Sequence, residues 1–418
     1  MSLTANVLFW ILLTLAVGQA PLVWAFVRAL RRGKKPVTER ERYPKVAAVL
    51  CLRGPDPFLE SCVEALLDQD YPNYDVRIVV DCPEDPAWAV VEEVVNRRKA
   101  DNVQILPLTD HRDTCGLKCS SLLQAVDSLD ESHEIMAQLD ADTVPHPTWL
   151  RELVAPLADE EVGVATGNRW YMPERPSCGS LVRYAWNAAA VVQMFCYRIP
   201  WGGTLAIKTS LFADSDLKHR WGNAFCEDTM LYEVLREQGL KVAFVPSLMM
   251  VNREACDVPG YFGWVRRQLL TARLYHPRWA AVAGHGVLTS LVQAAAVGLL
   301  IASMATGNWE SAAWIGGGLG VYLASMVVML VPMESAVRKI VANRGEPTAW
   351  LSVGNALKLL PVIPLTQALY GFVLVSTMLV REVQWRGVSY RVGGPWEIEL
   401  IEYRPYATDA SADGTVSL

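Results

Sequence analysis

Charged side chains are scarce in this sequence: Asp, Glu, Lys and Arg make up 20% of its 418 residues, whereas 52% are hydrophobic. Together with the 28 glycines the apolar share is about 59%, above the ~45–50% typical of soluble domains. This composition excludes a disordered chain and a purely soluble protein. The 38 basic residues are outnumbered by 44 acidic ones, so no general positive charge favours nucleic acid as a partner.

The nine cysteines lack the spacing of a disulfide framework or a zinc site, and all lie between residues 51 and 256. Their number is odd, no C-x-x-C pair occurs, and Cys115 and Cys119 have no second Cys or His pair at zinc-like spacing. Reduced thiols in a cytoplasmic domain are the simplest interpretation. We expect no structural zinc.

Ionisable side chains are absent from residues 1–27, and residues 7–27 form an apolar run long enough to cross a bilayer. Five basic residues follow at once: Arg28, Arg31, Arg32, Lys34 and Lys35. A cleaved signal peptide has its positive charge first and a shorter apolar run, which is the reverse of this order. We expect residues 1–30 to be an uncleaved membrane anchor that holds residue 31 onward in the cytoplasm.

Three further runs carry no charge: Trp279–Trp309, Ser311–Met333 and Leu359–Val380. Buried soluble helices seldom reach these lengths without a charge, so residues 279–380 are expected to form transmembrane or re-entrant helices. The basic loop expected at residues 338–344 belongs in the cytoplasm, which fits two crossings before it.

The last of these runs leaves the number of crossings open. Three arginines after it also favour the cytoplasm, which requires an even number of crossings: Arg381, Arg386 and Arg391. Pro361 and Pro364 break the run, and residues 346–358 could lie along the interface. A re-entrant hairpin is therefore an alternative to a full crossing.

Between the apolar runs, short hydrophobic stretches alternate with helical patterns. The expected strands are Lys45–Leu52, Tyr74–Asp81, Val103–Leu108 and Glu134–Asp140. The expected helices are Pro57–Asp70, Ala87–Lys99 and Gly116–Leu129. This alternation predicts an α/β fold with a mostly parallel sheet, in which ligands bind beyond the carboxyl ends of the strands. Asp81 and Asp140 each close a predicted strand, so we expect them at the same edge of that sheet.

Two carboxylates, Asp140 and Asp142, lie two residues apart at the end of a predicted strand. Such a pair can direct hard oxygen ligands at one divalent cation, Mg²⁺ or Mn²⁺, and leave positions open for phosphate oxygens. A D-x-D pattern is weak by itself, because Asp214-Ser215-Asp216 matches equally well. That second copy follows no strand, so a solvated turn or helix cap is the better interpretation for it.

Asp81 and Lys118 have both functional and ordinary interpretations. Asp81 can bind a ligand at the sheet edge or be a turn residue before Cys82-Pro83. Lys118 lies in the first turn of a predicted helix, where an anion can bind, or it is a surface lysine.

Glu227 and Asp228 open a helical pattern, and Gly202 and Gly203 precede a predicted strand. The two acids can stabilise a helix start, or one of them can act as a general base toward an attacking hydroxyl. The two glycines permit close approach of a ligand to the backbone.

A predicted helix over residues 259–275 combines aromatic residues with Arg267, Gln268 and Arg273. Since it directly precedes an apolar run, it is expected at the level of the lipid headgroups. Its arginines can bind a pyrophosphate or meet anionic lipid.

The order of these motifs resembles family 2 glycosyltransferases of the GT-A fold, most closely their ceramide glucosyltransferase-like branch. Two further segments strengthen the resemblance, Asp68-Gln69-Asp70-Tyr71-Pro72 and Val383-Gln384-Trp385-Arg386-Gly387. It implies that Asp140 and Asp142 hold the metal on a UDP-sugar, that Asp81 contacts the nucleotide and that Asp228 is the base. Lys118 would lie near the nucleotide. The family has a Q/R-x-x-R-W element. If Arg267 is its first residue, this sequence has Leu270 where the element has Arg and Thr271 where it has Trp.

The sequence thus predicts an inverting, metal-dependent glycosyltransferase that moves a sugar, glucose by the resemblance, from a UDP-sugar to a membrane lipid. A ceramide or diacylglycerol acceptor is expected, with Gly202, Gly203, Glu227, Arg267, Gln268 and Arg273 among the substrate-binding residues. The expected division is an anchor (1–30), a cytoplasmic GT-A domain (31–278), membrane helices (279–380) and a tail (381–418). Alternatives are a processive polysaccharide synthase, a polyprenyl-phosphate sugar transferase and a non-catalytic membrane scaffold.

Overall fold

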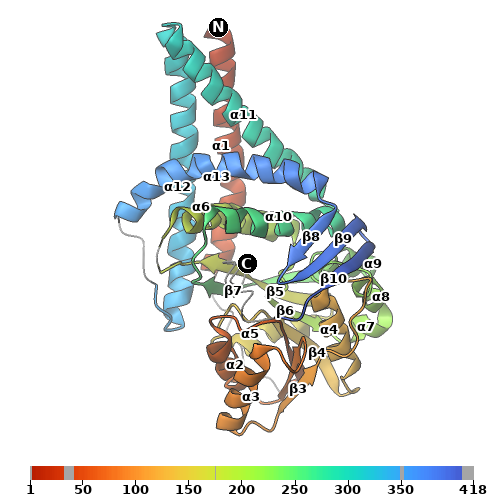
Figure 1. Ribbon diagram of the computed structural model, residues 1–418. Helices are drawn as coiled ribbons and strands as arrows, with labels where there is room; N and C mark the ends of the chain where they lie inside the picture. Colours follow the sequence, from red (N-terminus) through yellow and green to blue (C-terminus); the bar gives the residue numbers. More distant parts are fainter. Residues whose placement is uncertain (1, 33–41, 175, 349–352, 407–418) are drawn as a thin grey trace.

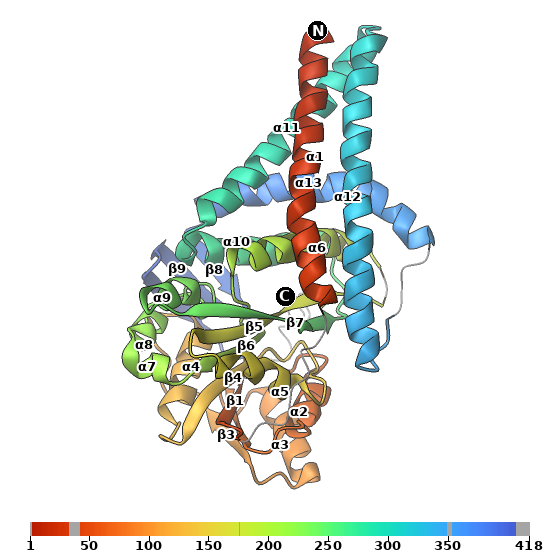
Figure 2. The ribbon, with the colours of Figure 1, turned by 180° about the vertical axis from the view of Figure 1, so that it is seen from behind.

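The structure is a computed structural model that describes residues 2–32, 42–174, 176–348 and 353–406. A sheet domain lies at one end and a bundle of long helices projects from it (Figures 1 and 2). The sheet has seven strands in the order β3-β2-β1-β4-β6-β5-β7, which confirms the predicted α/β class. Lys34, Lys35 and the polar segment after Tyr406 lie outside the described residues.

The first half of the sheet is parallel and agrees closely with the sequence prediction. Its strands are β1 (Lys45–Leu52), β2 (Tyr74–Val80), β3 (Val103–Pro107) and β4 (His133–Leu139). They alternate with α2 (Leu59–Leu67), α3 (Pro86–Arg98) and α4 (Leu117–Asp127). Val46 and Leu50 of β1 pack with α2 and α3, whereas Val49 packs with α4 on the opposite face. Both faces are thus covered, which explains why these strands read as continuous apolar runs.

The second half contains one antiparallel strand. β6 (Thr204–Lys208) is antiparallel to both β4 and β5 (Val162–Tyr171), and β5 is parallel to β7 (Lys241–Asn252). The sheet is therefore mostly parallel, as predicted. Short elements connect these strands: α5 (Trp149–Val154), a 3₁₀ turn (Ala155–Ala158), α7 (Ser210–Asp214), α8 (Leu217–Trp221) and α9 (Leu231–Glu237).

Two helices lie between the sheet and the long helices: α6 (Cys178–Tyr197) and α10 (Val258–Tyr275) (Figures 1 and 2). Asp257 caps α10 by accepting a hydrogen bond from the Gly260 amide, 2.7 Å away. Trp264 of α10 packs edge-to-face against Tyr171 of β5 and Trp186 of α6. This aromatic contact ties the layer to the sheet.

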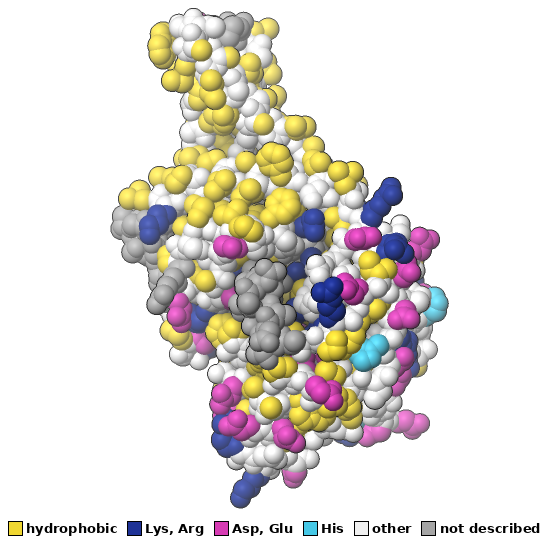
Figure 3. All heavy atoms as spheres, viewed as in Figure 1, with side chains coloured by type: hydrophobic (Ala, Val, Ile, Leu, Met, Phe, Trp, Pro, Cys, Tyr) yellow, Lys and Arg dark blue, Asp and Glu magenta, His cyan; other side chains and the backbone are white. Residues whose placement is uncertain are grey.

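Four helices among the described residues are long and apolar enough to cross a membrane. They are α1 (Ser2–Arg31), α11 (Trp279–Ala305), α12 (Trp309–Asn343) and α13 (Val353–Leu379). Large apolar side chains project from their outer faces, including Leu291 (64% exposed), Val328 (68%) and Phe372 (70%). Apolar atoms accordingly dominate this part of the surface, whereas charged ones gather on the sheet domain (Figure 3).

The helix α13 runs across the other three and does not extend alongside them (Figures 1 and 2). It is continuous through Pro361 and Pro364, so the expectation that these prolines break the run is wrong. Proline is tolerated there because neighbouring groups can satisfy the freed backbone carbonyls. The basic segment of residues 338–343 forms the last turns of α12 and is not a loop.

Residues expected to be a C-terminal tail include a small antiparallel sheet. It comprises β8 (Glu382–Trp385), β9 (Val388–Gly394) and β10 (Glu397–Tyr403). The turn between β8 and β9 uses Arg386 and Gly387 at positive φ, 45° and 78°. The Tyr390 hydroxyl accepts a hydrogen bond from the Leu117 amide at 2.9 Å, so this sheet packs on the start of α4. It thereby borders the edge of the main sheet where Asp81 and Asp140 lie.

Candidate active site

Asp140, one of the carboxylates predicted at the sheet edge, belongs to a hydrogen-bonded network with Lys118 and Glu227. Lys118 Nζ lies 2.6 Å from Asp140 Oδ1 and 2.8 Å from Glu227 Oε1. Gln138 Nε2 donates to Glu227 Oε1 and to the Gly202 carbonyl, each at 2.8 Å. These contacts join the ends of β4, α4 and the segment before α9, so Lys118 is not an isolated surface lysine.

Lys118 is the central charge of this network. Burial lowers the pKa of Lys118, but Asp140 and Glu227 outweigh burial and raise that pKa well above its usual value. Burial raises the pKa of Glu227, an effect that Lys118 opposes and Asp228 and Asp140 reinforce. One ammonium thus pairs with two carboxylates and compensates one of their two negative charges, and the network keeps both acids in fixed positions.

Asp228 lies at the end of this network. Its Oδ2 accepts from the Gly202 amide at 2.8 Å, and its Oδ1 accepts from the Thr229 hydroxyl at 2.8 Å. The side chain does not cap α9, whose first turn has no side-chain cap. Two hydrogen bonds therefore orient a half-buried carboxylate, as a general base requires.

The two predicted glycines are explained by close packing within the protein itself. A Cβ atom on Gly202 would lie 2.1 Å from Glu227 Oε1, and one on Gly203 would lie 2.8 Å from Asp140 Oδ2. The Cβ on Gly203 would lie closer still to the Trp201 ring, 2.2 Å away, so glycine avoids a clash with a carboxylate at the first position and mainly with a ring at the second.

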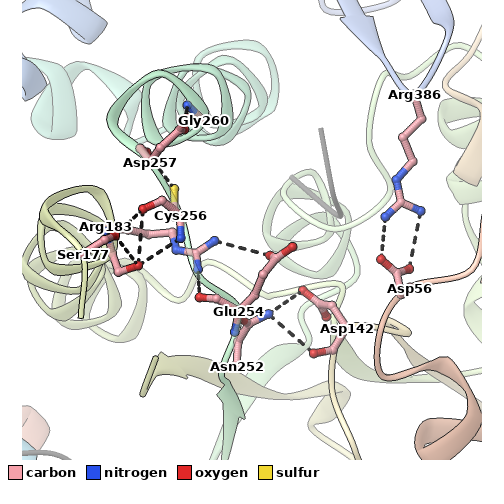
Figure 4. A network of polar contacts seen from close by, with 11 residues as sticks. Asp56, Asp142, Ser177, Arg183, Asn252, Glu254, Cys256, Asp257, Gly260 and Arg386 are labelled. Atoms are coloured by element: carbon pink, nitrogen blue, oxygen red, sulfur yellow. Dashed lines mark hydrogen bonds and ion pairs between the residues drawn. The ribbon is translucent and has the colours of Figure 1, made fainter. Parts of the chain in front are cut away.

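Asp142 lies on the other side of the site and is less completely paired. Asn252 at the end of β7 donates to Asp142 Oδ2 at 3.0 Å (Figure 4), and its Oδ1 accepts from the Glu254 amide at 3.0 Å. Asp142 Oδ1 is buried and has no hydrogen-bond partner in the described part of the chain. Burial, Asp140 and Asp56 raise the pKa of Asp142, and Arg169 opposes this shift, so a cation bound here would stabilise the ionised carboxylate.

These two aspartates fit a divalent cation. The described residues hold no cluster of three or more His, Cys, Asp and Glu side chains that would form a closed metal site. Mg²⁺ is commonly held by one or two carboxylates plus substrate phosphates, and the unpartnered Asp142 oxygen suits that role. The other D-x-D does not, because Asp214 and Asp216 are exposed and Asp216 pairs with Arg220 at 2.9 Å.

Asp81 is buried beneath the C-terminal sheet. Its Oδ2 is ion-paired with Arg53 and accepts from the Tyr403 hydroxyl at 2.9 Å, while His111 Nε2 lies 3.5 Å from Oδ1. Arg386 of the turn between β8 and β9 faces Asp56, 2.5 Å away (Figure 4). Among these groups, Arg53, Asp56 and Tyr403 carry no sequence signal of their own, because they come together only when the C-terminal sheet docks.

Arginines gather beside Asp142. Arg169 Nη2 donates to Gln268 Oε1 at 2.7 Å, and its guanidinium lies 4.6 Å from the Trp264 ring. Arg267 has no hydrogen-bond or ion-pair partner in the described part of the chain. Burial, Arg386, Arg169 and Arg266 lower the pKa of Arg267 to about 10. This excess of positive charge favours an anion, such as a diphosphate.

Arg273 lies elsewhere. Its Nη1 donates to the carbonyl of Thr377, at the C-terminal end of α13. Such a contact stabilises the end of a helix, and the structure does not bring Arg273 to the acidic residues.

A cavity of about 290 Å³ connects the site to the long helices. Asp228, Arg169, Trp201 and Gln268 line one part of it. Leu22, Met326, Leu330 and Ile363, from α1, α12 and α13, line another. The candidate base therefore faces a space that continues between apolar helices.

Glycosyl transferase family 21 matches residues 8–396 of this chain. The chain belongs to this family. It is a glycosyltransferase and an integral membrane protein, and part of it is homologous to a ceramide glucosyltransferase, which confirms the resemblance predicted from the sequence.

Among curated relatives, a ceramide glucosyltransferase of Komagataella phaffii is 34% identical over 71 residues. The aligned segment covers 16% of this chain and 14% of that relative. Among solved structures, a mannosyltransferase of Pyrobaculum calidifontis in complex with GDP-Man and Mn²⁺ superposes with a TM-score of 0.50 at 18% identity. That match covers 90% of this chain and 99% of the mannosyltransferase, which confirms the GT-A-like fold. Glucosyl-3-phosphoglycerate synthase of Mycobacterium tuberculosis gives a TM-score of 0.36 at 15% identity, covering 58% of this chain and 81% of the synthase.

Proposed function

We propose that this family member transfers a sugar from a UDP-sugar, UDP-glucose being the expected donor, to a hydroxyl of a membrane lipid. The acceptor would be of the ceramide or diacylglycerol type, and the product a glycolipid. The observation that carries the proposal is that Asp228 lines a cavity that continues between the long apolar helices. A lipid in that cavity can bring its hydroxyl to the carboxylate without leaving the bilayer.

Asp228 is the proposed general base. The hydrogen bonds from the Gly202 amide and the Thr229 hydroxyl fix its carboxylate, which takes the proton from the attacking lipid hydroxyl. The hydroxyl oxygen then bonds to the anomeric carbon as the bond to the diphosphate breaks. A single displacement of this kind inverts the anomeric configuration.

Asp140 and Asp142 are proposed to hold a divalent cation, Mg²⁺ or Mn²⁺. When bound, such a cation supplies Lewis-acid neutralisation of charge on the leaving diphosphate. Arg267, which lacks a partner of its own among the described residues, is proposed to bind the same diphosphate, with Gln268 held nearby by Arg169. Asp81 and Lys118 are proposed to lie near the nucleotide, and Gly202, Gly203 and Glu227 to shape the sugar site.

We also propose that the sheet domain is cytoplasmic. Arg28 and Arg31 lie in the last turn of α1, and Arg338 and Lys339 lie near the C-terminal end of α12. The C-terminal ends of both helices lie beside the sheet domain (Figure 2). Positive charge at these ends follows the positive-inside rule. Because α13 runs across the other helices, the chain would return to the same side after α11 and α12. The domain boundaries given above remain predictions.

Replacing Asp228 by Asn tests the proposal. The variant keeps the size of the side chain but cannot take a proton, so we expect kcat to fall about 10²–10⁴-fold. The measurement is a transfer assay with the purified enzyme, a UDP-sugar and lipid acceptors. Asp216→Asn, in the exposed D-x-D, is the matched control and should retain wild-type activity. Near-wild-type transfer by Asp228→Asn to a polyprenyl phosphate would favour that alternative acceptor, since it is already an anion. Long products on a sizing gel would instead favour a polysaccharide synthase.

A further inference from the structure

Arg169 of β5 is a deeply buried arginine without a carboxylate partner. Only 9% of the residue is exposed, and no Asp or Glu in the described part of the chain forms an ion pair with it. Two other arginines are buried still more deeply, and each has such a partner. Arg53 pairs with Asp81, and Arg183 Nη1 lies 3.5 Å from Glu254 Oε2. Because a buried charge without a counterion is costly, Arg169 favours an anionic ligand.

Neutral groups hold the Arg169 guanidinium in place. Its Nη2 donates to Gln268 Oε1 at 2.7 Å, and its Nε donates to Asn187 Oδ1 at 3.4 Å. The guanidinium lies 4.6 Å from the Trp264 ring and 5.7 Å from the Trp201 ring. Nη1 has no hydrogen-bond partner among the described residues and is not one of their buried unpartnered atoms. This donor is therefore accessible from the cavity that Arg169 lines.

On one side, Arg169 approaches the candidate cation site. It lies two residues before Tyr171 on β5, and Tyr171 is aligned with Asn252 of the neighbouring strand β7. Asn252 in turn donates to Asp142. Burial raises the pKa of Asp142, and the charge of Arg169 opposes that rise. The guanidinium is thus within electrostatic reach of Asp142.

On the other side, Arg169 approaches the candidate base. Trp201, whose ring contacts the guanidinium, directly precedes Gly202, and the Gly202 amide donates to Asp228. Arg169, Trp201 and Asp228 all line the same cavity. Arg169 therefore lies between the proposed cation site and the proposed base, where the bond between sugar and diphosphate would break.

We propose that Arg169 is a catalytic residue that donates a hydrogen bond from Nη1 to the departing β-phosphate of the UDP-sugar. The inference rests on the proposed function, because it takes the diphosphate to lie between Asp142 and Asp228. As the lipid oxygen bonds to the anomeric carbon, the bond from that carbon to the β-phosphate oxygen breaks. Its electron pair passes to that oxygen. Asp228 takes the hydroxyl proton, while Arg169 keeps its own protons and stabilises the new negative charge.

The first test is the effect of Arg169→Gln on steady-state kinetics. The full-length enzyme in lipid nanodiscs is supplied with a labelled UDP-sugar, a divalent cation and a lipid mixture. We expect kcat to fall about 10²–10³-fold, as for the loss of one donor to a developing anion, while the KM for the UDP-sugar changes less than about threefold. An arginine that binds the diphosphate equally before and after the bond breaks would instead raise KM.

A binding measurement without turnover isolates the charge of the leaving group. UDP ends in the β-phosphate that carries the new charge, whereas UMP lacks this phosphate. Wild-type enzyme and Arg169→Gln are titrated with each nucleotide in the presence of the divalent cation. We expect the variant to bind UDP about tenfold more weakly and UMP with unchanged affinity. A purely structural role for Arg169 would lower both affinities together.

Arg169→Lys tests whether the charge alone is sufficient. Lysine presents one ammonium in place of the planar guanidinium, so it cannot hold Gln268 and a phosphate in the same geometry. We expect kcat about tenfold below wild type and a UDP affinity about threefold lower, both less severe than in Arg169→Gln. If Arg169→Gln does not fold, this variant decides, because wild-type values of both quantities would overturn the proposal.

Arg220→Gln is the matched control. Arg220 also lies over a tryptophan ring, 5.8 Å from that of Trp396, and its side chain is 16% exposed. It differs from Arg169 because it pairs with two carboxylates, those of Asp216 and Glu237, and is not part of the cavity lining. This variant should keep the wild-type kcat and both nucleotide affinities.

The outcomes separate the two proposals. Lipid glycosylation by Arg169→Gln at the wild-type kcat, or UDP and UMP affinities that fall in proportion, would overturn the role of Arg169 and leave the proposed function intact. A wild-type enzyme that neither binds UDP nor transfers sugar from a UDP-sugar would overturn the proposed function itself.

Discussion

The two flanks of the candidate active site differ in how completely their charged groups are paired. On the paired flank, Lys118 contacts both Asp140 and Glu227, and Asp228 accepts two hydrogen bonds. On the open flank, one oxygen of Asp142 and the guanidinium of Arg267 have no partners among the described residues. The paired flank is held in place by the protein itself, whereas the open flank is completed by what binds there.

This difference predicts that variants on the paired flank affect stability and activity together, whereas those on the open flank affect ligand binding alone. The reason is that removing one partner of a buried ion pair leaves the other charge uncompensated. Removing a group without a protein partner has no such cost.

The largest effect is expected for Lys118→Met on the paired flank. Glu227, whose side chain is only 5% exposed, would lose its counterion. We therefore expect the free energy of unfolding to fall by about 3 kcal/mol. This value is near the low end for buried pairs because the Lys118 side chain is 28% exposed. Activity should fall below detection. Thermal unfolding in detergent and a transfer assay measure the two effects. Lys218→Met, which removes an exposed pair with Asp127, is the control and should change stability by less than about 1 kcal/mol. Unchanged stability of Lys118→Met would show that the paired flank is not held by this lysine.

Gly202→Ala should have an intermediate effect. The added Cβ would clash with Glu227 Oε1 and displace the Gly202 amide from Asp228, so we expect kcat to fall about 10–100-fold with a stability loss of about 1–3 kcal/mol. Gly284→Ala on α11 is the control, because its Cβ would meet no atom within 4 Å. Steady-state kinetics of both variants provide the measurement. Equal kcat values for the two alanine variants would contradict the role given to close packing at Gly202.

The smallest effect on stability is expected for Arg267→Gln on the open flank. The KM for the UDP-sugar should rise about tenfold, because the diphosphate loses a charged hydrogen bond, while the unfolding temperature stays the same or rises. Arg273→Gln is the comparison, since Arg273 contacts the Thr377 carbonyl and should affect stability without changing the donor KM. An Arg267 variant that unfolds more easily but keeps its donor KM would remove the distinction between the flanks.

The parallel half of the sheet could be predicted closely from the sequence, because buried strands and amphipathic helices leave strong periodic patterns. β1 has the predicted bounds. Asp81 directly follows β2 and Asp140 directly follows β4, on either side of β1 at the same edge of the sheet. The partners of Lys118 could not be predicted, since Asp140 and Glu227 are distant in the sequence and meet only through the fold.

The C-terminal sheet carries a weaker signal. Val388, Tyr390 and Val392 alternate with polar residues and are buried, as strands with one buried face require. The strands are short and charged on their outer face, and the arginine at positive φ in the turn is an uncommon choice. The crossing of α13 was equally hard to predict, because length and composition describe a span but not its direction.

The most direct test of the central claim is to identify the product. Purified enzyme with a labelled UDP-sugar, a divalent cation and a lipid mixture should yield a labelled glycolipid by mass spectrometry, with the sugar on a lipid hydroxyl and its anomeric configuration inverted. A labelled polymer, a sugar on a polyprenyl phosphate, or the absence of any labelled lipid would contradict it.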